Sequence, residues 1–226
     1  LLSMLPNGMK DMSNLVKLNL KNNRFAAFPS VTKLLPRVQE LALSQNGMEE
    51  LEIDTTIGTA AGDASRYDAF ASLKRLELDA NKLAQLPANF GRVFSGLSEL
   101  FLQGNELRDL PNSLSHLDRV ERINLSKNQL RVLPEWICSL TTLRFLDVSN
   151  NKISTLPSEI NKLQALQGLI IAGNRLSNLP KEYKDLKQFE NFSLFIVKYP
   201  PSRCFKFFRT TPTSEFLKVQ DDLYDD

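Results

Sequence analysis

The chain has 226 residues, of which 42% are hydrophobic, 28 are basic and 26 are acidic. This length and apolar content suffice for a large core, and the formal charge of +2 gives no broad basic field for nucleic acid. No apolar run approaches the ~18 residues of a membrane-spanning helix, so neither nucleic-acid binding nor membrane insertion is expected.

A leucine-rich pattern recurs along the chain. Its opening residues are separated by 23, 35, 24, 23, 23, 23 and 23 residues, and they are Leu15, Val38, Leu73, Leu97, Val120, Leu143, Leu166 and Phe189. An Asn follows each of the first seven openers by eight residues, at Asn23, Asn46, Asn81, Asn105, Asn128, Asn151 and Asn174. A fixed period of this length predicts stacked units. Because a buried Asn side chain carries donors and an acceptor, the Asn series predicts a hydrogen-bonded ladder along the stack.

A second recurring feature is an apolar residue followed by proline, as in Leu110-Pro111 and Leu133-Pro134. Proline stops regular helix or strand and fixes a turn. Apolar residues follow each step at short intervals, for example Ile137 and Leu140. The second half of each unit is therefore predicted to form a short convex segment.

The combined pattern, Leu-x-x-Leu-x-Leu-x-x-Asn-x-Leu-x-x-Leu-Pro, resembles the 23-residue Leu-Pro class of intracellular leucine-rich repeats. That class is found in Ras-binding scaffolds of the Sur-8 type, in Scribble and Erbin, and in plant Ras-group repeat proteins. The resemblance implies an α/β solenoid, a curved horseshoe with a parallel concave β-sheet of about eight short strands and an irregular, 3-10 or helical convex side. The solenoid is expected over residues 1–195, with a capping segment and acidic tail over 196–226.

Two stretches near the start of the chain depart from the period. Residues 1–12 match only the second half of a unit, so the first repeat is expected to be truncated and to need a cap or an upstream neighbour. The second unit carries an insertion of small and polar residues at 52–66, which predicts a surface loop. This loop is either a tolerated insertion or a second contact arm for a partner.

The strand half of each unit predicts which residues face the concave surface. We number the opener of each unit as position one. Because side chains alternate along a strand, positions three, five and seven should point outward, and positions four and six into the core. This places a charged group on the third and fourth units, namely Arg75, Glu77, Asp79 and Glu99, and an apolar group on the fourth to seventh, namely Phe101, Phe145 and Ile170. Arg122 and Asp147, on the fifth and sixth units, are also expected to contact the partner. Single exposed apolar residues are normal, but three on one face favour a binding site. Gly168 and Ala172 are expected to leave space beside them, as a pocket beside an anchor.

After Leu194 the pattern stops, and residues 197–209 mix aromatic and basic side chains. Such a mixture occurs in single-strand nucleic-acid binding. The alternative, which we favour, is that the aromatic residues cover the end of the solenoid. The acidic residues that follow are expected to form a solvated tail.

The residues offer little catalytic or metal-binding chemistry. His116 is the only histidine and is expected to face solvent, so no Ser-His or Cys-His couple and no zinc ligand set is predicted. Cys138 and Cys204 are predicted to be reduced thiols, with a disulfide between them as the alternative. We therefore expect no catalytic residues, no metal and no cofactor, and a cytoplasmic or nuclear location.

The sequence thus predicts a non-enzymatic protein–protein interaction domain, a scaffold or adaptor that binds a protein partner on its concave face. The resemblance implies a Ras-like small GTPase or a phosphatase as the partner. Two alternatives stay open. One is a regulatory or substrate-recognition domain of a larger multidomain enzyme, such as a kinase, phosphatase, cyclase or ubiquitin ligase. The other is an architectural repeat segment of a cytoskeletal assembly.

Overall fold

A computed structural model of the chain describes residues 1–29, 35–53, 70, 72–177, 181, 193–195 and 208–209. The expected insertion at 52–66 lies outside the described residues after Ile53. The expected capping segment and tail at 196–226 also lie outside them, apart from Phe208 and Arg209.

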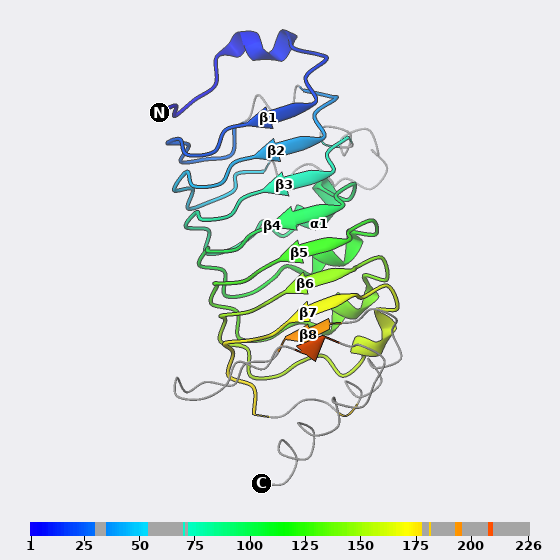
Figure 1. Ribbon diagram of the computed structural model, residues 1–226. Coiled ribbons are helices and arrows are strands. Elements are labelled where there is room, and N and C mark those ends of the chain that lie inside the picture. The colour runs from blue at the N-terminus through cyan, green and yellow to red at the C-terminus, as the bar shows by residue number, and fades with distance from the viewer. Residues whose placement is uncertain are drawn as a thin grey trace.

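Each unit contributes one short strand to a single sheet (Figure 1). The strands are β1 (Lys17–Asn19), β2 (Glu40–Ala42), β3 (Arg75–Glu77), β4 (Glu99–Phe101), β5 (Arg122–Asn124), β6 (Phe145–Asp147), β7 (Gly168–Ile170), β8 (Ser193–Phe195) and β9 (Phe208–Arg209). They lie side by side in chain order, parallel from β1 to β8, and β9 is antiparallel to β8. The predicted parallel sheet is confirmed, with β9 as an addition that the sequence did not predict.

The sheet register aligns equivalent positions of successive units. Each strand from β1 to β7 spans positions three to five of its unit, and its central residue is buried from β2 onward, as at Leu76 and Leu100. β8 covers positions five to seven counted from Phe189, so this strand lies two residues later than the sequence pattern predicted. Position three therefore forms one row across the sheet, and position five forms a second row beside it. This register decides which concave side chains become neighbours.

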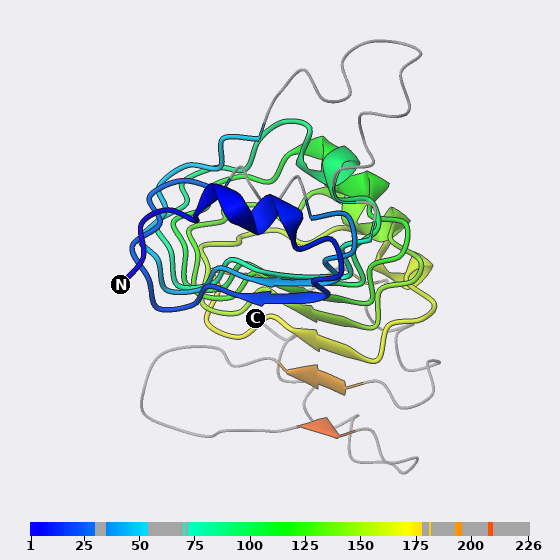
Figure 2. The same ribbon diagram turned by 90° about the horizontal axis from the view of Figure 1, so that it is seen from above.

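The convex side consists of short helical segments behind the sheet (Figure 2). These are α1 (Phe90–Val93), η4 (Asn112–His116), η5 (Glu135–Ser139) and η6 (Ile160–Lys162), while η1 (Asn7–Asp11) lies across the N-terminal end of the stack (Figure 1). Among the described residues, only α1 is an α-helical turn, and it lies in the unit whose repeat is 24 residues long. An α-turn holds about 3.6 residues where a 3-10 turn holds about 3.0, so the wider α-turn accommodates the extra residue. The predicted convex side is confirmed.

The core runs continuously between the two sides, and the predicted asparagine ladder is present along it. In the fifth unit, Asn128 Oδ1 accepts the backbone N–H of Leu107 at 3.0 Å, and Nδ2 donates to the carbonyls of Leu102 and Leu125, both at 3.0 Å. Equivalent bonds recur from Asn46 to Asn174. Each Asn thus satisfies backbone groups of its own unit and of the preceding one.

The turn after each strand was not predicted from the sequence. Position eight has a left-handed backbone in seven units, at Asn22, Gln45, Ala80, Gly104, Lys127, Asn150 and Gly173. Position seven precedes this turn and is half-buried at Lys21, Asp79, Gln103 and Ala172. Ser44, Ser126 and Ser149 are buried, so the prediction that position seven faces the concave surface is wrong for these residues.

Candidate partner-binding face

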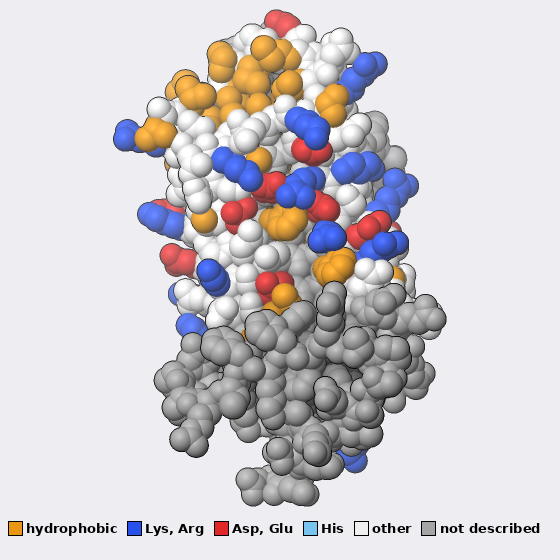
Figure 3. Space-filling view, in the orientation of Figure 1, with side chains coloured by type: hydrophobic (Ala, Val, Ile, Leu, Met, Phe, Trp, Pro, Cys, Tyr) orange, Lys and Arg blue, Asp and Glu red, His pale blue; other side chains and the backbone are white. Residues whose placement is uncertain are grey.

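The concave surface carries a band of charged side chains across the middle strands, with apolar side chains among them (Figure 3). The structure brings the predicted site residues together on neighbouring strands. Arg75, Glu99, Arg122 and Phe145 belong to the position-three row, Glu77, Phe101, Asp147 and Ile170 to the position-five row, and Asp79 follows β3 at position seven. We call the surface made by these nine residues the candidate face.

The charges of the candidate face pair with one another. Arg75 forms ion pairs with Glu77 (Nε to Oε1, 2.6 Å) and with Glu99 on the next strand. Glu99 also lies 3.6 Å from Arg122 Nε, and Glu77 pairs with Lys21. A continuous series of opposite charges therefore runs from Lys21 to Arg122, in which each arginine is held by at least one carboxylate.

Burial and ion pairing act in opposite directions on Glu77. Burial acts to raise the pKa of Glu77, but hydrogen bonds from Lys21 and Arg75 and their positive charges outweigh it, so the pKa lies below the ordinary value. For Arg75, burial acts to lower the pKa, while hydrogen bonds and charge from Glu77 and Glu99 raise it above its ordinary value. Both side chains are charged at neutral pH.

The two aromatic residues are covered by arginines. Arg75 Cζ lies 4.5 Å from the ring centroid of Phe101, and Arg122 Cζ lies 4.3 Å from that of Phe145, within the range of cation–π interactions. Both rings are half-buried as a result, although the sequence placed them openly on the surface. Knowledge of the strand register would have predicted that Arg122 covers Phe145, since the register sets these two residues directly beside each other.

Gly168 does not leave an open space beside Phe145, contrary to the expectation. A Cβ built on Gly168 would come within 2.9 Å of Cδ1 of the Phe145 ring. The ring itself occupies the room that the missing side chain provides, and Gly168 is buried. Phe145 is therefore held between Arg122 and Gly168, its two neighbours in the position-three row.

A shallow depression of about 450 Å³ opens among these residues. Its lining includes Phe101, Arg122, Asn124, Phe145, Asp147 and Ile170, from β4 to β7. Phe145 and Ile170 are diagonal neighbours in the register, because Phe145 pairs with Gly168 and Asp147 pairs with Ile170. We call this depression the concave groove.

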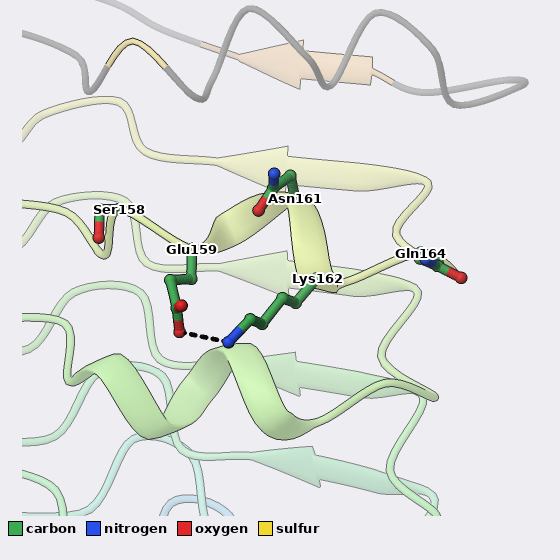
Figure 4. A pocket seen from close by; sticks show the side chains of 5 residues that line it. All are labelled: Ser158, Glu159, Asn161, Lys162 and Gln164. Carbon is green, nitrogen blue, oxygen red and sulfur yellow. Dashed lines mark hydrogen bonds and ion pairs between the residues drawn. The ribbon is translucent and has the colours of Figure 1, made fainter.

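A second depression, of about 480 Å³, lies on the convex side and is drawn in Figure 4. It is lined by Ser158, Glu159, Asn161, Lys162 and Gln164, all from one unit. Glu159 and Lys162 point toward each other and form an ion pair at 2.6 Å, while the other side chains do not converge on them. This arrangement presents no set of groups aimed at one ligand.

The described part of the chain shows no constellation suited to catalysis or metal binding. His116 is exposed and its Nδ1 lies 3.1 Å from the Ser113 carbonyl. Among the described residues no group of three or more His, Cys, Asp or Glu side chains could hold a metal ion, and no helix is long and apolar enough to span a membrane. Burial, followed by the charges of Glu135 and Glu159, raises the pKa of the Cys138 thiol to about 12. Cys138 is therefore a protonated, buried thiol at neutral pH, and Cys204 lies outside the described residues.

Comparison with known proteins gives a consistent picture. Family models described as leucine rich repeat match residues 71–130 and 142–163. The chain is 35% identical over 105 residues to Ras guanine nucleotide exchange factor V of Dictyostelium discoideum, covering 46% of this chain and 5% of that protein. It is 35% identical over 111 residues to the probable serine/threonine-protein kinase pats1 of the same organism (49% and 3%), and 34% identical over 91 residues to adenylate cyclase of Schizosaccharomyces pombe (40% and 5%). The chain thus spans only a small fraction of the curated relatives that it matches.

Solved structures show the same architecture. A leucine-rich-repeat protein of Leptospira interrogans aligns with a TM-score of 0.62 at 26% identity, covering 87% of this chain and 52% of that one. Internalin C2 of Listeria monocytogenes aligns with a TM-score of 0.65 at 22% identity, covering 84% and 74%. The internalin likeness concerns the fold alone.

Proposed function

Since this chain is a leucine-rich-repeat protein, and such repeats serve protein–protein interaction, we propose that it is a recognition domain that binds a protein partner on its concave face. The observation that carries the proposal is the concave groove, whose two aromatic rings, Phe101 and Phe145, are each covered by an arginine. Interface hot spots are enriched in aromatic residues and arginine. The anchors are Phe101, Phe145 and Ile170.

The fixed positions of these side chains support binding on physical grounds. Ordering a long side chain at an interface costs about 0.5–1.5 kcal/mol. Arg75 and Arg122 are already ordered before a partner arrives, because each is paired with an acid and packed on a ring. Most of the entropy cost of ordering these two side chains is therefore met during folding and does not weaken the binding of a partner.

The proposed partner class is a Ras-like small GTPase. Support comes from the relative named as a Ras guanine nucleotide exchange factor, which shares 35% identity over part of its length. The proposed location is the cytoplasm, where such signalling proteins work.

A second candidate function is a regulatory or substrate-recognition segment of a larger enzyme. The relatives include a probable kinase and an adenylate cyclase, and the chain covers 3% and 5% of them. In this setting the same concave face would hold a substrate or another domain of the same protein. Both candidates use the candidate face, so one experiment tests that shared element.

The test is capture of partners from cell lysate by the immobilised chain, followed by direct binding to a purified Ras-like GTPase loaded with GDP or a GTP analogue. A Phe145→Asp, Ile170→Asp double variant should lose its partners, while Val132→Asp, at a 51% exposed valine off the concave strands, should keep them. Circular dichroism checks that all three proteins are folded. Partner sets that are the same for the double variant and the wild type would refute binding on the concave face.

A further inference from the structure

The concave groove has an uncompensated negative charge beside its apolar anchors. At the outward positions of the first seven units there are four cations, Lys17, Lys21, Arg75 and Arg122, and five anions, Glu40, Glu77, Asp79, Glu99 and Asp147. All four cations are ion-paired with acids of the same face. Among the described residues, Asp79 and Asp147 are the two of these acids that have no Lys or Arg partner.

These two aspartates differ in what surrounds them. Asp79 accepts a hydrogen bond from Ser44 Oγ at 2.5 Å and lies outside the groove lining. Asp147 lines the groove, and its Oδ1 accepts the backbone N–H of Ser149 at 2.9 Å, which leaves the remaining acceptor capacity of the carboxylate unused. Within the described part of the chain, Asp147 is therefore the anionic group of the groove that lacks a basic partner.

The position of Asp147 relative to the anchors limits what can bind. It lies directly across from Ile170 on the next strand and two residues after Phe145 on its own strand. These steps correspond to roughly 5–7 Å in a sheet, about the separation of side chains on adjacent or alternate residues of a bound segment. An apolar side chain seated among Phe101, Phe145 and Ile170 thus places a neighbouring residue of the ligand near Asp147.

We propose that the concave groove binds a protein segment that carries both an apolar and a basic residue, an inference that rests on the proposed function. A large apolar or aromatic side chain of the segment enters the groove, and a nearby Lys or Arg pairs with Asp147. Charge complementarity selects this occupant. An acidic segment would be repelled by the charge of Asp147. It would also gain little from Arg75 and Arg122, because both are already paired with Glu77 or Glu99. The occupant is a protein segment because the groove is open, shallow and lies on a face built of repeated strands.

The neighbouring unit supplies a safe substitution for the test. Asn124 occupies the position equivalent to Asp147, and its Oδ1 accepts the N–H of Ser126 at 3.0 Å, as Asp147 does for Ser149. Asp147→Asn therefore removes the charge and keeps the turn. The matched control is Asp118→Asn, the same change at an exposed residue of the connection between η4 and β5.

The experiment selects binders from a random linear-peptide library displayed on phage, using the immobilised intact chain, and then measures the affinity of the synthesised peptides. Enriched sequences are expected to carry Lys or Arg within two residues of a large apolar side chain. Asp147→Asn should weaken them about tenfold, Asp118→Asn should leave them unchanged, and selection on Asp147→Lys should favour acidic sequences instead.

The outcomes separate this inference from the function on which it rests. Enrichment of acidic peptides, no enrichment at all, or equal affinity for the wild type and Asp147→Asn would overturn the basic apolar segment. If Ile170→Asp abolishes binding while Asp147→Asn does not, the groove still binds but without the charge contact. If neither variant changes the affinity of the selected peptides, the concave groove itself is not the binding site.

Discussion

Asn128 and Asn124 lie in the same unit, and they show how differently the interior and the concave surface use one side chain. Asn128 belongs to a position that is Asn in seven successive units and that binds the backbone of two units at once. Asn124 belongs to a row in which its neighbours are Phe101 and Asp147. Positions that repeat hold the units together, whereas positions that vary give each part of the surface its own chemistry.

The largest effect is expected from removing one member of the ladder. Asn128→Ala leaves the N–H of Leu107 and the carbonyl of Leu102 buried without the partners that Asn128 provides, and the free energy of unfolding should fall by about 3 kcal/mol. The control is Asn124→Ala, which removes bonds only to Ser126 and should cost about 1 kcal/mol or less. Urea unfolding of both variants measures the difference. Equal losses would show that the ladder is no more important than the surface.

The contact between successive convex turns should come second. A Cβ on Gly91 in α1 would lie 1.9 Å from the backbone oxygen of Ser113 in η4, so Gly91→Ala forces two main-chain segments apart. We expect a loss of about 2–3 kcal/mol, seen as a lower urea midpoint. Gly8→Ala is the control, because a Cβ there meets nothing within 4 Å. An unchanged midpoint for Gly91→Ala would mean that the convex segments can move apart at little cost in stability.

A smaller effect concerns the ion pairs of the candidate face. Because the pKa of Glu77 is lower in the folded chain than its ordinary value of 4.5, its contribution to stability is complete above that value. This contribution is lost as the pH falls through the folded pKa. Surface ion pairs contribute about 1 kcal/mol or less, so the decline should be modest.

Urea midpoints between pH about 6 and about 3 test this linkage. Glu77→Gln should flatten the decline, whereas Glu106→Gln, at an exposed residue without an ion pair among those described, should not. A decline of the same steepness in Glu77→Gln would assign the pH dependence to other groups.

The smallest effect should be a gain in stability. Ala80 has a φ of 52°, which costs a non-glycine residue about 1–2 kcal/mol, while glycine adds about 0.5–1 kcal/mol of chain entropy to the cost of folding. Ala80→Gly should therefore raise stability by about 0.5 kcal/mol, as a small upward shift of the urea midpoint. Gly104→Ala makes the reverse change at the same position of the next unit and should lower it. Destabilisation by Ala80→Gly would show that the turn does not strain Ala80.

The repeating part of the fold was predictable because it depends on spacing along the chain. The period placed β3 to β7 and the buried Asn128 without knowledge of any contact. The left-handed turn at position eight was not predicted. Glycine would indicate such a turn, but it occupies this position only at Gly104 and Gly173 among the described units. Tertiary hydrogen bonds, such as the one from Ala80 N–H to Gln103 C=O at 2.8 Å, hold that conformation against local preference.

The candidate face was predictable as a set of residues but not as an arrangement. Alternation along the strand identified Phe145 and Arg122 as surface residues, and the structure places both on the concave side. The stacking of Arg122 on Phe145, and of Phe145 over Gly168, depends on side-chain rotamers and on contacts between different units. A pattern read one unit at a time does not contain that information.

The asparagine ladder also gives the solenoid a direction. Each Asn binds groups of the unit before it, as Asn151 does for the N–H of Leu130 and the carbonyl of Leu125. A fragment shortened from its C-terminal side loses these side chains, so main-chain groups of its last unit lose the Asn that paired them. A fragment shortened from its N-terminal side keeps its first Asn, although strand groups such as the N–H of Gln39 lose the partners that they had in the removed unit. Shortened versions of this protein should therefore tolerate removal of N-terminal units better than removal of C-terminal units.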